Sequence, residues 1–241
     1  FELMDEDGVL EYILPELEEG RAMPQPSYHH LDVRGHILEA LAQMEKLIAD
    51  PTDALPASFE RLEKYLLGDQ IPPMLLMAAL MHDIGKPRSF SHEPGDRIRF
   101  IAHDKESAQM AEEILARCAW PSEVRHPIVQ FCRQHLRPFG LADPGQDGEI
   151  EDEHSEGWVT LRAIRRMFRE VEPHEMGLIM LALADSRACR GPAVSHAYQV
   201  EVELILDDIV QRYYEYKEEQ KYRPLLTGQD LIDAGYTPGP L

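Results

Sequence analysis

A histidine and an aspartate stand side by side at the end of a very apolar stretch. The stretch "PPMLLMAALMHDIGKPRSF" covers residues 72–90, and the pair is His82-Asp83. An imidazole nitrogen and a carboxylate oxygen are both ligands for divalent metal ions. Gly85 and Pro87 follow at once and predict the end of a helix, because glycine accepts a left-handed conformation and proline cannot continue the helix. The pair is therefore expected in or at the end of the last turn, where both side chains can reach one point.

Other histidines with the same chemistry lie on separate expected helices. His36 stands near the start of an amphipathic segment, His103 opens a helix and His135 closes one. His29 and His30 compete with His36 for the first position, but prolines and a serine flank them and indicate a loop, which favours His36. His30 or Asp32 is a second-shell alternative that would orient the ligands.

Asp185 follows a run of uniformly apolar residues, 178–184. An ionised carboxylate buried in such surroundings costs on the order of several kcal/mol unless it is paired or bound to a cation. Asp185 is therefore a candidate metal ligand. A hydrogen bond between helices or a salt bridge with Arg187 or Arg190 is the structural alternative.

Together these residues provide a mixed nitrogen and oxygen ligand set. Such a set suits six-coordinate Mn, Fe, Co, Ni or Mg better than a tetrahedral zinc site, which prefers thiolates. The three cysteines, Cys118, Cys132 and Cys189, form no close pair and no metal-finger spacing. We expect them to lie outside the site, and their pattern fits a reducing, cytoplasmic location.

The order of these residues resembles the HD superfamily of metal-dependent phosphohydrolases. The blocks "HILEAL", "HDIGKP", "FIAHDKESA" and "LALADSRA" look like the motif blocks of that superfamily. The resemblance implies one metal ion held by a first ligand group and a second ion held by two further histidines. By that resemblance the first group is His36, His82, Asp83 and Asp185, and the second pair is His103 and His135. Ala102 departs from the pattern, since relatives usually have glycine there, and a tight backbone approach at this position stays an open question.

The flanks narrow the resemblance. "DGVLEYILPELE" and residues 223–240 look like segments that flank the HD domain in bacterial tRNA nucleotidyltransferases and poly(A) polymerase relatives. The head that adds nucleotides in those proteins uses a Gly-Ser loop and paired aspartates on a strand, and neither pattern occurs in this sequence. The resemblance therefore implies the C-terminal part of such a protein, without nucleotide-adding activity of its own.

Three functions follow as hypotheses. The first is hydrolysis of a phosphomonoester or a 2′,3′-cyclic phosphate of a nucleotide or RNA end, with one or two divalent ions. In it, Asp83 positions the attacking water and Lys86 neutralises a phosphate oxygen, although Lys86 also reads as an ordinary surface lysine. The second is a non-catalytic domain that positions RNA for a nucleotidyltransferase head. The third, a signalling domain for cyclic dinucleotides or guanosine polyphosphates, is disfavoured by the flanking segments.

The charge pattern limits contact with nucleic acid to a local patch. The formal net charge of −20 would repel RNA at long range. One segment nevertheless carries four arginines at helical spacing opposite an apolar face, and these are Arg162, Arg165, Arg166 and Arg169. They are candidate contacts for a phosphate or for RNA, with tRNA as the candidate partner. The alternative is pairing with the acidic residues of 149–156 or 170–175.

The periodicity predicts an all-α, HD-type helical domain with flanking helical segments. We expect residues 1–28 to flank it, 29–200 to form it, and 201–241 to be a long helix with a tail. Residues 86–101 and 138–156 read as loops, the second as either a mobile lid or a disordered insertion. Gly68 is a predicted left-handed helix cap. No membrane span is expected, and the oligomeric state is open. The helices are expected at 33–50, 57–68, 73–84, 103–118, 122–135, 157–171, 174–189 and 195–221.

Overall fold

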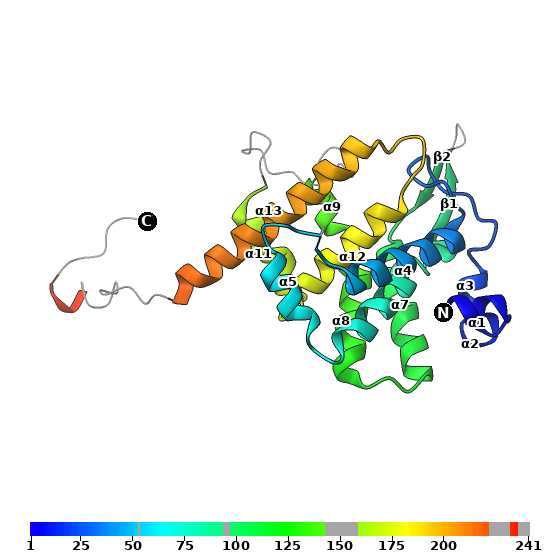
Figure 1. Cartoon of the computed structure of the whole chain (residues 1–241), viewed down its shortest axis with the longest axis horizontal. Coiled ribbons are helices and arrows are strands. Elements are labelled where there is room, and N and C mark those ends of the chain that lie inside the picture. The colour runs from blue at the N-terminus through cyan, green and yellow to red at the C-terminus, as the bar shows by residue number, and fades with distance from the viewer. Residues whose placement is uncertain (53, 94–96, 143–158, 222–231, 236–241) are drawn as a thin grey trace.

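Helices make up most of the protein (Figure 1). The computed structural model describes residues 1–52, 54–93, 97–142, 159–221 and 232–235. The elements are α1 (Glu2–Glu6), α2 (Leu10–Ile13), α3 (Pro15–Glu18), α4 (Val33–Ala49), α5 (Phe59–Leu66), α6 (Ile71–Met81), the 3-10 helix η1 (Pro87–Ser89), β1 (Phe90–Glu93), β2 (Arg97–Phe100), α7 (His103–Arg117), α8 (Ser122–Gln134), α9 (Arg137–Ala142), α11 (Leu161–Arg169), α12 (Glu175–Ala188) and α13 (His196–Lys221).

The all-α prediction is confirmed. The helices expected from periodicity are present, with ends that differ by a few residues from the expected ones. The only sheet in the described ranges is the antiparallel pair β1–β2, in which Phe90 faces Phe100. The apolar faces of the helices are buried in one continuous core.

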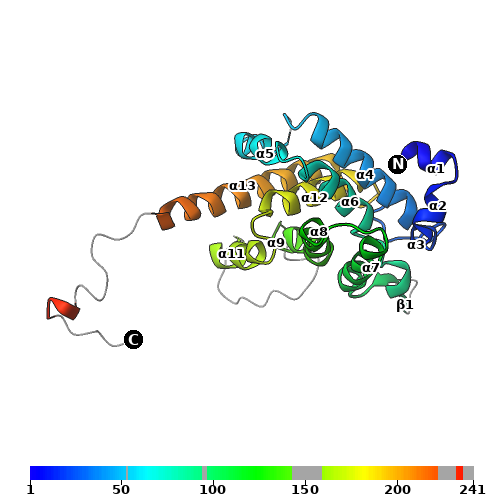
Figure 2. The same ribbon diagram turned by 90° about the horizontal axis from the view of Figure 1, so that it is seen from below.

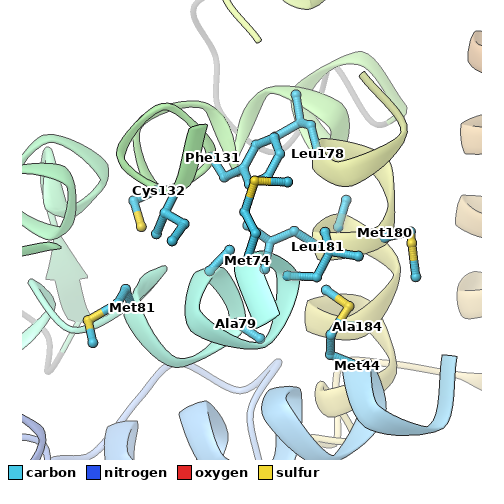
Figure 3. Packing of buried hydrophobic residues seen from close by; sticks show 14 of the residues in the cluster. Met44, Met74, Ala79, Met81, Phe131, Cys132, Leu178, Met180, Leu181 and Ala184 are labelled. Atoms are coloured by element: carbon cyan, nitrogen blue, oxygen red, sulfur yellow. The ribbon is translucent and has the colours of Figure 1, made fainter. Parts of the chain in front are cut away.

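Helix α6 is the centre of that core. It packs against α4, α8 and α12 and is buried along nearly its whole length, which explains why its sequence is apolar on every side. Figure 3 shows Met74 of α6 reaching toward Phe131 of α8, with Leu181 of α12 beside it. This packing fixes the end of α6, where His82-Asp83 follows.

The prediction of a loop at residues 86–101 is wrong. This segment contains η1 and the β1–β2 hairpin. Each strand has only four residues and is stabilised by pairing with the other, so a short alternation in the sequence gives little signal. The expected loop at 138–156 begins inside α9, and its residues 143–156 lie outside the described part of the chain.

The two glycines predicted to end helices in a left-handed conformation do not adopt it. Among the described glycines only Gly8 and Gly235 have positive φ, so neither Gly85 nor Gly68 is a left-handed cap. At Gly85 the cause is close packing, because a Cβ there would lie 2.4 Å from the backbone nitrogen of Ser107. The Gly85 N–H also donates to the Ser107 hydroxyl at 2.9 Å. Gly85 thus lets the turn after Asp83 sit against α7.

The flanking segments differ in how they meet the core. Helices α1 to α3 gather near the N-terminus, whereas α13 runs along α12, α11 and α9 (Figures 1 and 2). α13 continues without a break across residue 200, and its Leu206 and Val210 are buried in the common core. The domain boundaries themselves stay predictions. No helix in the described ranges is long and apolar enough to span a membrane.

Candidate metal centre

The predicted ligands converge at the point where α4, α6, α7, α8 and α12 meet. His36 lies in the first turn of α4, and His82 and Asp83 directly follow α6. His103 is the first residue of α7, His135 follows α8, and Asp185 lies in α12. All six side chains are buried.

Four of these residues form a first ligand group. The Nε2 atom of His36 lies 3.2 Å from Oδ2 of Asp83 and 3.0 Å from Oδ1 of Asp185. The Nε2 atom of His82 lies 3.2 Å and 3.8 Å from the same two oxygens. One donor atom from each residue lies within 4.8 Å of all the others, which is a spacing that one metal ion can bridge.

A second ligand group shares Asp83 with the first. The Nε2 atoms of His103 and His135 lie 3.3 Å and 3.5 Å from Oδ1 of Asp83. The first group instead approaches Oδ2 of the same carboxylate. Asp83 therefore presents one oxygen to each group, which is the arrangement of a carboxylate that bridges two ions.

The local backbone holds three of the imidazoles with Nε2 toward the site. The Nδ1 atoms of His82, His103 and His135 lie 2.8, 2.7 and 2.7 Å from backbone carbonyls three residues earlier. A carbonyl accepts the proton of Nδ1, so in the neutral ring Nε2 keeps its lone pair. These three Nε2 atoms, that of His36 and Oδ1 of Asp83 are buried without a hydrogen-bond partner in the described structure. Buried nitrogen and oxygen atoms without a hydrogen-bond partner fit the role of ligands to a divalent cation.

The alternative that Lys86 is an ordinary surface lysine is wrong, because this residue is only 5% exposed. Its Nζ lies 2.6 Å from Oδ2 of Asp83 and donates to the Gln25 side chain at 2.8 Å. Burial would raise the pKa of Asp83, but Lys86 and His82 outweigh burial and hold that pKa well below its usual range. Both carboxylates of the centre are therefore ionised, and their negative charge attracts a cation.

Asp185 does not form the salt bridges considered as its alternative. Arg187 pairs with Glu203 at 2.7 Å, and Arg190 approaches Glu39 at 3.2 Å. Burial would raise the pKa of Asp185, but contact with His36 and His82 holds that pKa well below its usual range. The ion-pair contacts of this carboxylate among the described residues are thus with His36 and His82 of the centre.

Ala102, at the position where relatives usually have glycine, adopts a backbone conformation that glycine favours. Its φ of 60° and ψ of 26° place it in the left-handed region, immediately before α7. Glycine takes this conformation without the steric cost that a Cβ brings. The turn still forms, and it places His103 beside Asp83.

The surroundings of His36 differ in several respects from those expected from the sequence. His30 is exposed, and Asp32 caps α4 by accepting from the N–H of Gly35, so neither contacts the centre. His29 lies against His36 with ring centroids 4.4 Å apart. Cys189, expected to lie outside the site, has its Sγ 3.9 Å from Oδ1 of Asp185. Only the fold brings the loop before α4 next to the end of α12.

The four arginines of α11 are exposed on the face opposite its buried residues. Arg165 stacks on Tyr216 of α13 at 4.3 Å, and Arg169 approaches Glu170 at 3.5 Å. Residues 149–156, the alternative acidic partners, lie outside the described part of the chain.

Comparison with known proteins places this chain in a family. The family model for the HD domain matches residues 35–188, a range that contains all six predicted ligands. The chain is 32% identical to an A-adding tRNA nucleotidyltransferase of Deinococcus radiodurans, over 97% of this chain and 45% of that protein. It is 27% identical to a CC-adding tRNA nucleotidyltransferase of Thermus thermophilus, over 95% of this chain and 42% of that protein. The chain thus spans less than half of the length of each.

A shorter match extends the same likeness. A multifunctional CCA protein of Variovorax paradoxus is 31% identical over 56% of this chain and 27% of its own length.

Proposed function

Because this chain belongs to the HD domain family, we propose that it is a divalent-metal-dependent phosphohydrolase. The observation that carries the proposal is the shared carboxylate of Asp83, which turns one oxygen to each of two buried ligand groups. The ions that fit these oxygen and nitrogen donors are Mn, Fe, Co, Ni or Mg.

The chain's own residues would bind and orient the reactants. When bound, the metal would supply Lewis-acid polarisation of a phosphoryl oxygen and lower the pKa of nearby water. Asp83 would accept a hydrogen bond from the attacking water and so fix its direction of attack. Lys86, whose Nζ lies 2.6 Å from Oδ2 of Asp83, would neutralise a non-bridging phosphate oxygen.

The substrate class we propose is a phosphomonoester or a 2′,3′-cyclic phosphate on a nucleotide or RNA end. Two features support an RNA substrate. The relatives with the longest matches are named as tRNA nucleotidyltransferases. Arg162 and Arg166 are exposed beside Arg165 and Arg169 and can contact phosphates locally despite the acidic surface. We infer that the chain corresponds to the C-terminal part of such a protein.

The exposed arginines of α11 also favour a second candidate function. In it, the domain positions tRNA for a nucleotidyltransferase head, and the metal centre is structural. The two functions differ in turnover, since a positioning domain binds RNA and metal without hydrolysing the ester.

The experiment is hydrolysis of 2′,3′-cyclic AMP and of a generic phosphomonoester by metal-stripped protein, with Mn, Ni, Co or Mg added singly. Asp83→Ala is the test variant. The matched control is Asp104→Ala, because Asp104 belongs to the other His-Asp dipeptide and is in none of the possible ligand groups of the described structure. Activity that returns with metal in the wild type and in Asp104→Ala, but not in Asp83→Ala, supports the hydrolase. A folded protein that binds metal and RNA without turnover under any of these conditions supports the positioning domain.

A further inference from the structure

A third group of possible ligands lies beside the metal centre and uses a cysteine. His29, His36 and Cys189 each place one donor atom within 4.8 Å of the other two. The Sγ of Cys189 lies 3.4 Å from Nδ1 of His29. His36 belongs both to this group and to the first ligand group of the centre.

The chemistry of the third group differs from that of the other two. It contains one thiol and two imidazoles, which is a set preferred by Zn²⁺ and other thiophilic ions. Zn–N and Zn–S bonds of roughly 2.0 and 2.3 Å place ligand atoms about 3.5 Å apart at a tetrahedral angle. The 3.4 Å between Cys189 and His29 matches this spacing.

The surroundings of the three donors suit a cation. Both ring nitrogens of His36 are buried without a hydrogen-bond partner among the described residues. The carboxylate of Asp185, 3.9 Å from Sγ, adds negative charge next to an incoming cation.

The backbone holds His29 and Cys189 together. The N–H of Gly191 donates to the carbonyl of Tyr28 at 2.9 Å, and the N–H of Ala193 donates to that of Ser27 at 3.1 Å. A Cβ on Gly191 would lie 2.2 Å from the Ser27 carbonyl oxygen, so this close approach requires glycine. The loop before α4 is thereby fixed against the segment that follows α12.

We propose that His29, His36 and Cys189 form an inhibitory site for Zn²⁺. Binding forms a zinc–sulfur bond and releases the thiol proton of Cys189 to solvent. It also engages the imidazole of His36, which the first ligand group then loses. The inhibitory part rests on the proposed hydrolase function, whereas the thiolate-containing metal site does not.

The experiment uses Co²⁺ as a spectroscopic substitute for Zn²⁺, because thiolate bound to Co²⁺ gives a charge-transfer absorption in the near ultraviolet. Wild-type protein is expected to show this band. Cys189→Ser is expected to lose it, while the matched control Cys118→Ser, at an exposed cysteine, keeps it. His29→Ala tests the imidazole partner and is expected to weaken cobalt binding in this band about 10- to 100-fold. A wild-type protein that binds Co²⁺ without the band, or a band that persists in Cys189→Ser, overturns the site.

A second measurement tests inhibition. Each variant's Mn-dependent hydrolysis is titrated with Zn²⁺ and normalised to its own zinc-free rate. We expect the zinc concentration for half inhibition to rise about 100-fold in Cys189→Ser and to stay unchanged in Cys118→Ser. Equal inhibition of both variants overturns the inhibitory role. Absence of hydrolysis in every variant would contradict only the proposed function. The cobalt band would still show whether His29, His36 and Cys189 bind a metal ion.

Discussion

His82 and Asp83 are neighbours in the chain and also meet through their side chains, with Nε2 3.2 Å from Oδ2. Burial lowers the pKa of His82, but Asp83 and Asp185 outweigh burial and raise that pKa to about 10. Without metal, the proton on His82 occupies the place of a cation. This contact stabilises the metal-free fold fully below about pH 6.5 and is lost as the pH rises through about 10.

Metal binding near pH 8 should therefore release about one proton from His82, because a ligating imidazole must be neutral. Affinity should also fall as the pH falls. Calorimetric titrations in buffers of different ionisation enthalpy measure the released protons. A binding enthalpy that is the same in all buffers would contradict the expectation.

Metal content should separate the two ligand groups. Asp83→Ala removes the shared carboxylate and should lose both ions, whereas His135→Ala should lose only the second. His126→Ala, at an exposed histidine of α8, is the matched control and should keep both. Atomic spectroscopy after equilibrium dialysis gives the content. Equal metal in Asp83→Ala and His135→Ala would rule out a bridging role for Asp83.

Gly85→Ala should destabilise the protein by about 1–3 kcal/mol, since its Cβ overlaps the backbone of Ser107. Gly140→Ala is the control, because a Cβ at this glycine of α9 has no neighbour within 4 Å. Denaturant unfolding measures both free energies. Similar values for the two variants would show that the turn after Asp83 relaxes without cost.

Ala102→Gly should stabilise the protein by about 1 kcal/mol, because glycine takes the left-handed conformation without strain. Ala116→Gly, at an exposed position inside α7, should instead cost about 1 kcal/mol. Thermal unfolding of the two variants should shift in opposite directions. A destabilised Ala102→Gly would mean that the Ala102 side chain contributes packing that outweighs its strain.

RNA binding should depend on α11. Replacing Arg162 and Arg166 by glutamate should weaken binding of a tRNA acceptor stem at every sequence. It should also reduce the slope of log affinity against log salt by roughly 0.7 to 0.9 for each lost phosphate contact. Each of these substitutions is also made singly and compared with Arg133→Glu, at an exposed arginine of α8, which makes the same change of charge elsewhere. Equal loss of RNA affinity in the α11 variants and in Arg133→Glu would show that the effect comes from overall charge.

The sequence by itself determined the helices and the kinds of ligand. Helix periodicity is local, so the amphipathic stripe of α4 and the apolar run of α6 are readable without any tertiary contact. The order of histidines and aspartates predicted a metal site, because few other kinds of site use those side chains together.

The tertiary structure decided which atoms meet. Only packing of α6 against its neighbours shows that Asp83 turns a different oxygen to each ligand group and that Lys86 is buried beside it. The approach of His29 to Cys189 was equally hidden, because residues far apart in the chain leave no mark of their contact in a local pattern. Distances between helices follow from how side chains fill the core, and one sequence read locally does not contain them.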